Sequence, residues 1–439
     1  MTTPGAETQE SNTAPTHVRQ RVLGFLCVMS FILYLDRICI SQAAKRMEDD
    51  LGISHTAMGF VFGSFTLAYG LFQVPTGHWG DRHGSRKVLT GIVWIWSLLT
   101  MITGLSNGLI FLLIVRFLFG AGEAGALPNA IKSVERWFPA HARGRAMGIV
   151  LMAALLGGAV SPVVAEELIQ RLGWRWTFVA LGVPGILWGA WFYWWYRDDP
   201  AEHPAVNESE RHYIALGRGA KTDANDHPSI PWNKVLTAAN VWLMGAISTC
   251  CAFTTYLFFF WYSTYLQEGR SVSSELASQL AGLVLISGAV GSFCGGYLSD
   301  WLVRLTGERK WSRRLLTFPA LASAAGSMVL SIRFTDPWPA ALCAAWACLA
   351  IHLSLPSGWN VVAEISGPHL GALWGLLNSM GVAGAYLSPI FLGGFVDYLR
   401  KLGHVGREQW DPAFYVYAGL LLIGAFAWLF VDPEKSVVA

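Results

Sequence analysis

The stretch GHWGDRHGSRK, residues 77–87, places Gly77 four positions before Asp81 at the end of a long apolar run. A second stretch, GYLSDWLVR at 296–304, repeats that arrangement with Gly296 and Asp300, 219 positions later. A further pair of stretches, GRAMG (144–148) with GALWG (371–375), recurs at an offset of 227, as do Ser161-Pro162 and Ser388-Pro389. Two separate markers at nearly the same spacing indicate a duplicated unit of about half the chain, an arrangement found in transporters.

The composition around these markers is typical of a membrane protein. Apolar residues make up 53% of the 439 residues and charged residues only 14%, whereas soluble domains carry about 25% charged residues. The formal net charge of +2 gives no reason to expect a nucleic-acid partner. The seven cysteines lie in apolar stretches without metal-like spacing, so we interpret them as packing residues.

Twelve apolar runs are long enough to cross about 30 Å of hydrocarbon as helices. A single long polar break, rich in Pro, Asp, Glu and His, divides them into two groups of six. We therefore predict a tail at 1–20, a first bundle at 21–196, a linker at 197–237, a second bundle at 238–431 and a tail at 432–439. The expected spans are 21–44, 57–80, 88–106, 109–132, 145–169, 176–196, 238–266, 277–303, 314–333, 338–361, 370–397 and 412–431.

The distribution of Lys and Arg predicts the orientation. With the N-terminus inside, the tails and inner loops hold 19 of the 31 basic residues, the outer loops hold 9, and three lie within spans. The positive-inside rule then places both termini in the cytoplasm. In the linker, Asn207-Glu208-Ser209-Glu210 has the pattern of a capping box that opens a short surface helix.

Four charges interrupt the apolar runs of spans 1 and 4. Asp36 and Arg37 are adjacent in FILYLDRICI (31–40), and RFLFGAGEAGALPN (116–129) carries Arg116 and Glu123. A charge at the bilayer centre costs roughly 2.5–3.5 kcal/mol even on lenient scales. Arg116 and Glu123 share a helix face but lie about 10 Å apart along the axis, so each needs a partner from another helix.

We predict a cross-helix network in which Asp36 pairs with Arg116, while Arg37 is contested between Glu123 and an external anion. Substrate arriving at Arg37 would tip Glu123 toward protonation, which is the logic of proton-coupled anion import. The alternative is a static charge cluster that holds spans 1 and 4 together.

GHWGDRHGSRK resembles the inner-loop signature of the major facilitator superfamily. The resemblance implies an all-α integral membrane protein with twelve transmembrane helices in two pseudo-symmetric six-helix bundles. YLDR (34–37) together with the Arg116–Glu123 pattern is similar to the anion:cation symporter family, which includes bacterial sugar-acid transporters, sialin and vesicular glutamate transporters.

That resemblance implies roles for individual residues. Asp36 and Glu123 correspond to proton-coupling groups, and Arg37 corresponds to the arginine that binds the substrate carboxylate. Tyr34, Tyr69 and Asn378 match family positions that contact the polar substrate, although the tyrosines could instead serve packing and Asn378 could bond a neighbouring helix. Further candidate substrate contacts are Arg116, Trp261 and Trp359, of which the two tryptophans could instead serve packing. Candidate gating residues are Gly77, Asp81, Arg82, Gly84, Arg86 and Asp300. A glutamine of the family pattern is replaced by apolar sequence near Ala153-Ala154, which leaves the exact substrate open.

The sequence therefore predicts a proton-coupled importer of a small organic anion in the bacterial inner membrane, acting as a monomer without a cofactor other than the proton. Span 7 carries no arginine, which favours a hydroxylated monocarboxylate such as an aldonate or uronate. The alternatives are an organic-phosphate exchanger or facilitator and a membrane sensor that moves nothing. We do not expect an enzyme, because no phosphate-binding loop, metal spacing or nucleophile triad is present in the sequence.

Overall fold

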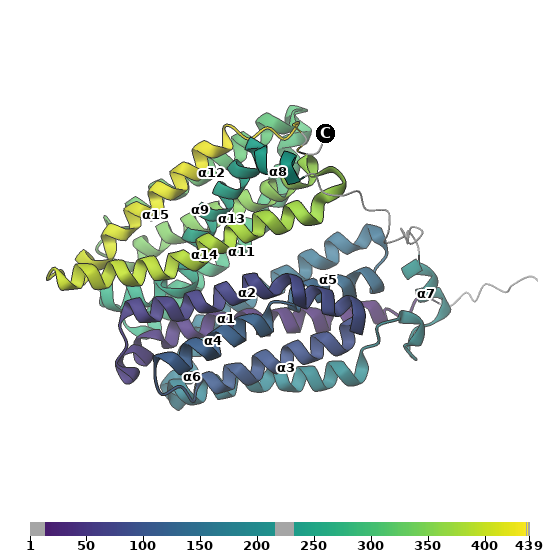
Figure 1. Ribbon diagram of the computed structural model, residues 1–439, viewed down its shortest axis with the longest axis horizontal. Helices are drawn as coiled ribbons and strands as arrows, with labels where there is room; N and C mark the ends of the chain where they lie inside the picture. The colour runs from purple at the N-terminus through teal and green to yellow at the C-terminus, as the bar shows by residue number, and fades with distance from the viewer. Residues whose placement is uncertain (1–13, 216–231, 436, 438–439) are drawn as a thin grey trace, which may run out of the picture.

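A computed structural model describes residues 14–215, 232–435 and 437, so part of the predicted linker, 216–231, lies outside the described residues. Helices are the only regular secondary structure among the described residues, and they form two bundles that lie side by side in Figure 1. The first bundle contains α1 (Val18–Leu51), α2 (His55–His83), α3 (Ser85–Thr103), α4 (Leu109–Glu123), α5 (Ala126–Trp137) and α6 (Ala140–Trp195). The second contains α9 (Ala239–Phe260), α10 (Tyr262–Thr264), η2 (Tyr265–Gly269), α11 (Ser274–Thr306), α12 (Arg309–Ser331), α13 (Pro337–Ile365), η3 (Gly367–His369), α14 (Leu370–Lys401) and α15 (Arg407–Trp428). Between the bundles run η1 (Pro200–Glu202), α7 (Glu208–Ala215) and α8 (Trp232–Thr237).

Eleven helices of the described chain are long and apolar enough to span a membrane, and one of them supplies two crossings. A straight helix of 56 residues, the length of α6, would measure about 84 Å, more than twice the hydrocarbon thickness. The chain turns back at Gly173, whose φ of 76° and ψ of 161° are not helical. Backbone of this kind is accessible almost only to glycine. The prediction of twelve transmembrane helices is therefore confirmed, with spans 5 and 6 joined through Gly173.

The two bundles repeat one packing scheme. In the first, α1 packs on α6, α2 on α4 and α3 on α6; in the second, α9 packs on α14, α11 on α13 and α12 on α15. A Cβ added at Gly157 would lie 2.1 Å from the Phe31 carbonyl oxygen, and one at Gly384 would lie 2.3 Å from that of Thr249. These two glycines are again 227 positions apart, so the internal repeat is a repeat of helix contacts.

Gly77 and Gly296, the glycines of the two repeated stretches, do not make close helix contacts. No atom lies within 4 Å of a Cβ built on Gly296, and the nearest atom to one on Gly77 is 3.7 Å away. The close approach in the second bundle occurs at Gly291 and Gly295, where α11 meets the backbone of α13. Spacing of four residues alone did not reveal which face of the helix meets a neighbour.

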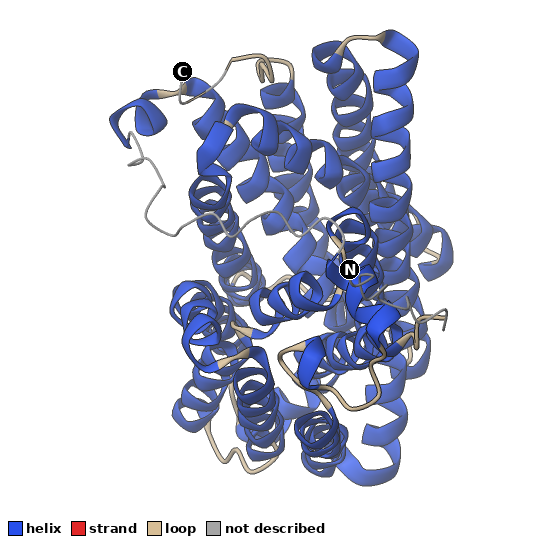
Figure 2. Ribbon diagram, turned by 90° about the vertical axis from the view of Figure 1, so that its right-hand side faces the viewer, coloured by secondary structure: helices blue, strands red, loops and turns tan. Residues whose placement is uncertain are grey.

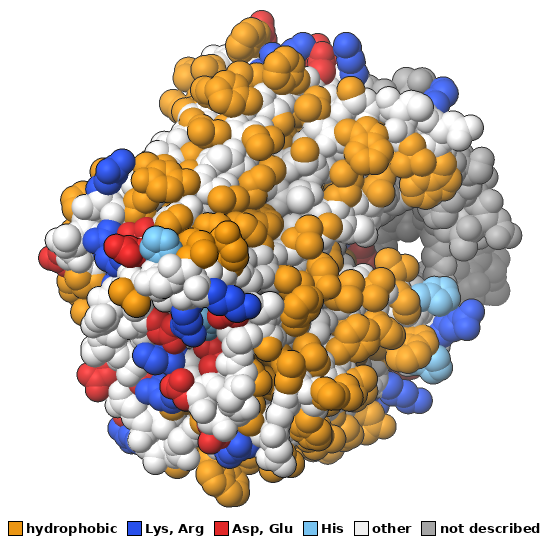
Figure 3. Space-filling model, turned by 60° about the vertical axis from the view of Figure 1, so that its left-hand side comes forward, with side chains coloured by type: hydrophobic (Ala, Val, Ile, Leu, Met, Phe, Trp, Pro, Cys, Tyr) orange, Lys and Arg blue, Asp and Glu red, His pale blue; other side chains and the backbone are white. Residues whose placement is uncertain are grey.

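Figure 2 views the molecule from the end where α1 begins and α15 ends. We call this the terminal end. The opposite, distal end is formed by the α1–α2 junction, the turn of α6 at Gly173, and the α9–α11 and α14–α15 junctions. Figure 3 shows charged side chains gathered at the distal end, while large apolar side chains cover much of the sides. Exposed apolar side chains such as Ile110, Trp194 and Phe293 (75%, 72% and 67% exposed) suit contact with lipid.

The bundles meet through α2 with α14 and through α6 with α11. Several hydrogen bonds that join them lie at the distal end. The Asp397 carboxylate of α14 accepts bonds from the backbone N–H and the hydroxyl of Thr56, at 2.7 and 2.6 Å, and so caps the N-terminus of α2. Gln42 of α1 bonds to Ser263 and to the Ser274 carbonyl oxygen. The distal end is thus held closed across the two bundles.

Candidate functional site

An ion pair between α1 and α4 lies at the centre of the first bundle. Nε of Arg37 donates to Oε1 of Glu123 at 2.7 Å, and Nη2 of Arg37 donates to the same oxygen. The two residues are 3% and 1% exposed. Glu123 is the last residue of α4, which is separated from α5 by a two-residue turn at Ala124 and Gly125. The predicted contact between Arg37 and Glu123 is therefore present.

Aromatic rings frame the Arg37 guanidinium. Its Cζ lies 4.5 Å from the ring centroid of Tyr34, 4.8 Å from that of Tyr69 and 5.3 Å from that of Phe65. Such contacts stabilise a cation that has lost its water. Tyr34 and Tyr69, both predicted substrate contacts, thus lie beside the predicted carboxylate-binding arginine, and both side chains are only partly buried.

The predicted pair of Asp36 and Arg116 does not form in this structure. Both residues are fully buried, yet no described residue makes a hydrogen bond to either Asp36 carboxylate oxygen or to any guanidinium nitrogen of Arg116. The Arg116 guanidinium stacks on the Phe119 ring instead, 4.3 Å from its centroid. Asp36 and Arg116 interact through space without reaching contact. Two opposite charges in the membrane interior are thus left without hydrogen bonds.

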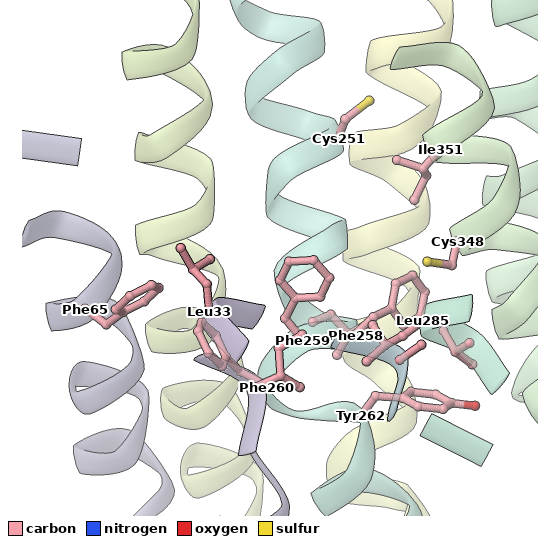
Figure 4. Close-up of a cluster of buried hydrophobic side chains, with 14 of the residues drawn as sticks. Leu33, Phe65, Cys251, Phe258, Phe259, Phe260, Tyr262, Leu285, Cys348 and Ile351 are labelled. Atoms are coloured by element: carbon pink, nitrogen blue, oxygen red, sulfur yellow. The ribbon is translucent and has the colours of Figure 1, made fainter. Parts of the chain in front are cut away.

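Apolar side chains of the two bundles pack together close to this charged group. Phe62 of α2 stacks on Phe260 of α9, with ring centroids 4.7 Å apart and planes 4° apart. In Figure 4, Phe65 and Leu33 of the first bundle lie opposite Phe259 and Phe260 of α9. These side chains come from both bundles, so the bundles are in apolar contact beside the Arg37 site.

The predicted substrate contacts of the second bundle divide into two groups. Asn378 donates to the Gln73 side chain at 2.8 Å and so joins α14 to α2. Trp359 is 45% exposed and lines a cavity of about 100 Å³ together with Asn378 and Trp374. Trp261, in contrast, is fully buried, and its indole N–H donates to the Pro389 carbonyl oxygen at 3.0 Å. This placement gives Trp261 a packing role and does not support the predicted substrate contact.

His352, which the sequence placed in an apolar span, has a local partner. Its Nδ1 lies 2.8 Å from the Cys348 carbonyl oxygen one turn earlier in α13. This contact suits a structural role.

The predicted gating residues lie at the terminal end. Gly84 has a φ of 80° between α2 and α3, and the Asp198 carboxylate accepts a bond from the Arg86 backbone N–H at 3.0 Å. A Cβ on Gly84 would lie 2.4 Å from that carboxylate. Lys132 of α5 donates to the Gly77 carbonyl oxygen. These contacts fix the α2–α3 turn within the first bundle.

The remaining gating candidates are less constrained. Arg82 is exposed in the last turn of α2, and the side chain of Asp81, in the same turn, lies outside the described part of the structure. Asp300 lines an open cavity of about 420 Å³ at the terminal end of the second bundle, beside Arg304, Arg309 and Arg313. There Glu364 forms a two-point ion pair with Arg313, at 2.5 and 2.6 Å.

Comparison with known proteins identifies the family. The profile of the Major Facilitator Superfamily matches residues 26–311, about two thirds of the chain. The chain belongs to the Major Facilitator Superfamily. Among solved structures, a bacterial homologue of the lysosomal transporter Spinster, inward-facing and unoccupied, has the same fold, with a TM-score of 0.80, 21% identity and coverage of 94% and 97% of the two chains. The D-xylose-proton symporter superposes with a TM-score of 0.73 at 15% identity, over 94% and 98% of the two chains.

Curated relatives of this superfamily member are transporters of anions. A probable sulfoacetate transporter of Cupriavidus necator is 30% identical over 95% of both chains. A probable L-galactonate transporter of Escherichia coli is 27% identical over 97% of this chain and 93% of its own length. The hexuronate transporter of Bacillus subtilis is 28% identical over 94% of each. These relatives confirm the resemblance to sugar-acid and anion transporters, and the protein is a multi-pass membrane transporter, not an enzyme.

Sequence reasoning missed the ionic group at the distal end. His55 lies between Glu48 of α1 and Glu268 of η2, with Arg400 of α14 beside it. All four residues fall at or beyond the ends of predicted spans. Charged residues are expected there, so their presence did not indicate a site. Charged groups at the ends of four different spans were a signal, but only the fold shows that they meet.

Proposed function

We propose that this transporter imports a small organic anion together with protons by alternating access. The observation that carries the proposal is the buried Arg37–Glu123 pair, framed by two tyrosines, with Asp36 and Arg116 unbonded nearby. Buried ion pairs are weak stabilisers compared with apolar side chains of similar volume. A cluster of four ionic groups in one bundle therefore suits exchange of partners better than it suits stability.

The exchange follows from the contact geometry. A substrate carboxylate that binds Arg37 must compete with Glu123 Oε1, which now takes two of the guanidinium donors. Glu123 would then be a buried charge without its partner, which is costly in the membrane interior unless it takes up a proton. Asp36, buried beside it without a hydrogen bond, is the second candidate proton carrier. Substrate and proton would thus enter the site together.

The names of the relatives support an organic anion, and the L-galactonate and hexuronate transporters among them support a hydroxylated monocarboxylate such as an aldonate or uronate. The excess of Lys and Arg at the terminal end supports an orientation with both termini in the cytoplasm, as in a bacterial inner-membrane protein. With the distal end closed, the structure then corresponds to an inward-facing state. We further propose that the monomer is the functional unit.

Uptake by purified protein in liposomes tests this proposal. Galactonate, glucuronate, sulfoacetate and phosphate are offered with an acidic exterior, in potassium buffer without sodium. We expect accumulation of a sugar acid that disappears when a protonophore collapses the gradient. Uptake that ignores the gradient contradicts proton coupling, and preference for phosphate would instead support the organic-phosphate alternative.

A further inference from the structure

His55, the first residue of α2, has a carboxylate at each of its two ring nitrogens. Nδ1 lies 2.9 Å from Oε2 of Glu48, and Nε2 lies 2.9 Å from Oε2 of Glu268. His55 and Glu48 are 3% and 6% exposed. The rings of Trp261 and Trp410 pack edge-on against the imidazole, with centroids 5.6 and 5.5 Å away. The contacts of His55 with the two carboxylates are therefore shielded from solvent within the distal end, and they are separate from the Arg37 site.

The protonation state of His55 decides how many of these bonds can exist. A neutral imidazole carries one N–H and can donate to one carboxylate, whereas the protonated ring donates from both nitrogens. Two carboxylates at 2.9 Å are both satisfied only by the protonated ring. Hydrogen bonds between charged groups are also about twice as strong as neutral ones.

The bond to Glu268 joins the two bundles, since Glu48 and His55 belong to the first bundle and Glu268 to the second. Burial acts to raise the pKa of the Glu268 carboxyl, but the hydrogen bond from His55 and the charges around it hold that pKa below its ordinary value. The carboxylate is thus poised to remain charged in this contact.

The other charged groups around His55 come from α1 and α14. Nη2 of Arg400 lies 2.7 Å from His55 Nε2 and 3.5 Å from Glu268 Oε2, and the Arg400 side chain is half exposed. Asp397 lies one turn earlier on α14 and bonds to Thr56, next to His55. The positive charge of Lys45, on α1, also helps to lower the pKa of Glu268. Arg400 is therefore the group that can donate to Nε2 when the ring is neutral.

We propose that His55 is a second protonation site of this transporter, which holds the distal end closed when protonated and loosens it when neutral. In the protonated state His55 forms ion pairs with Glu48 and Glu268, and the pair with Glu268 links the two bundles. In the neutral state Nδ1 donates to Glu48, Nε2 accepts from Arg400, and Glu268 loses its bond to the first bundle, so that an ion pair between the bundles is replaced by a hydrogen bond from Arg400 of α14 to an uncharged ring. The closed-to-open ratio of the distal end then falls as the pH on that side rises. This inference goes beyond the proposed function and needs no bound substrate.

A distance measurement across the distal end tests the proposal. Spin labels are placed on Leu105→Cys in the α3–α4 loop and Thr335→Cys in the α12–α13 loop, both exposed and in different bundles. The native cysteines that are not buried, Cys27, Cys294 and Cys343, are replaced by serine. The label distance distribution is recorded between pH 5.5 and 9 in nanodiscs without substrate. We expect the closed-to-open ratio to fall roughly tenfold, the size of one charge-assisted hydrogen bond.

Two variants and one control make the result specific. His55→Gln cannot carry the charge, so its closed-to-open ratio should not change with pH. Glu268→Gln removes the carboxylate that requires the second N–H, so it should flatten the pH profile in the same way. It provides the second test if the His55 variant does not fold. His404→Gln replaces an exposed histidine at the same end, paired with Glu408, and should leave the profile unchanged.

A pH dependence that persists in both His55→Gln and Glu268→Gln, or its absence in the parent protein, overturns the proposal. Repeating the titration in Glu123→Gln separates the two sites, because a profile that vanishes there places the titrating group at the centre and also overturns the role of His55. Failure of anion uptake alone would contradict the proposed function and leave this result standing.

Discussion

Arg37 and Glu123 form a buried ion pair in which one carboxylate oxygen remains unused. Both are almost completely buried, and the Arg37 guanidinium concentrates two of its donors on a single Glu123 oxygen. The second oxygen of Glu123 has no hydrogen bond to any described residue. A pair with this unused capacity can rearrange when an anion arrives, whereas a fully satisfied pair would resist.

Replacing Glu123 by glutamine tests the role of that carboxylate. The amide keeps a carbonyl oxygen for Arg37 but cannot take up a proton. We expect exchange of labelled for unlabelled substrate to persist within a few-fold, while accumulation driven by a pH gradient is lost. Both are measured in the same liposomes. Equal loss of exchange and accumulation would instead indicate a static charge cluster.

Replacing Arg37 by lysine tests anion recognition. A lysine ammonium is a compact charge that reproduces neither the planar fork of donors nor the stacking on Tyr34 and Tyr69. We expect substrate affinity, measured by thermal shift or calorimetry, to fall at least roughly tenfold. The control is Arg171→Lys, at an exposed ion pair with Glu167, which should bind normally. Unchanged affinity in Arg37→Lys would remove Arg37 from the binding site.

Single elements show how local sequence and tertiary contacts share control of a helix end. The predicted capping box in the linker is half formed: the Glu210 backbone N–H donates to the Asn207 side chain at 3.0 Å, as expected for the start of α7. The Glu210 side chain does not complete the box. It accepts bonds from the backbone N–H groups of Val18 and Arg19, at 2.9 and 3.0 Å, and so caps α1.

This second cap predicts a pH-dependent stability. Burial acts to raise the pKa of Glu210, but the bonds from Thr16, Arg19 and Val18 outweigh it and hold that pKa below its ordinary value. A lowered folded-state pKa means that the stabilisation is present above the unfolded pKa, near 4.3, and is lost as the pH falls through the lower folded value. Glu210→Gln should cost about 1 kcal/mol at pH 7.

Thermal unfolding in detergent at pH 7 and at pH 3 measures this effect. The difference in melting temperature between parent and Glu210→Gln should shrink at the lower pH, where the parent also loses its charge. Glu208→Gln, on the exposed side of the same helix, serves as the control and should match the parent at both values. An equal loss of stability in Glu208→Gln would show that α7 itself, not the cap, is affected.

In the molecule as a whole, the twofold internal repeat rests on close helix contacts in equivalent places. Gly157 allows α6 to approach α1, and Gly384 allows α14 to approach α9, each against a carbonyl oxygen. The same relation joins Ser161, which donates to the Leu35 carbonyl oxygen, with Ser388, which bonds to Tyr417. Equivalent positions in the two bundles thus perform similar packing tasks with different partners.

Alanine at either close-contact glycine should therefore destabilise the protein. The added methyl group would overlap a carbonyl oxygen, and overpacking of this kind costs about 1–3 kcal/mol. We expect Gly157→Ala and Gly384→Ala to lower the melting temperature by similar amounts. The controls are Gly148→Ala and Gly375→Ala, which are also 227 positions apart but have no atom within 4 Å of the new Cβ. Equal melting temperatures for both pairs would contradict this account of the repeat.

Much of the architecture could be read from the chain, because apolar length, Lys and Arg distribution and repeated spacing are properties of neighbouring residues. The contact between Arg37 and Glu123 also followed, since helix periodicity showed that the charges of span 4 could not satisfy one another. The pairing of Asp36 with Arg116 did not follow, because the Phe119 ring competes for the guanidinium, and ring placement is set by packing. Trp261 likewise could not be assigned to packing from its sequence context.

The sequence by itself determined a helical membrane protein of twelve crossings, in two related halves, with four charges that need partners beyond their own helices. The tertiary structure alone decided which partners they find, which glycines bring helices together, and that His55 meets Glu268, 213 positions away. The physical reason is the distance along the chain over which each effect acts. Helix period and membrane thickness act along the local chain, whereas contacts between bundles depend on how two separately folded surfaces meet.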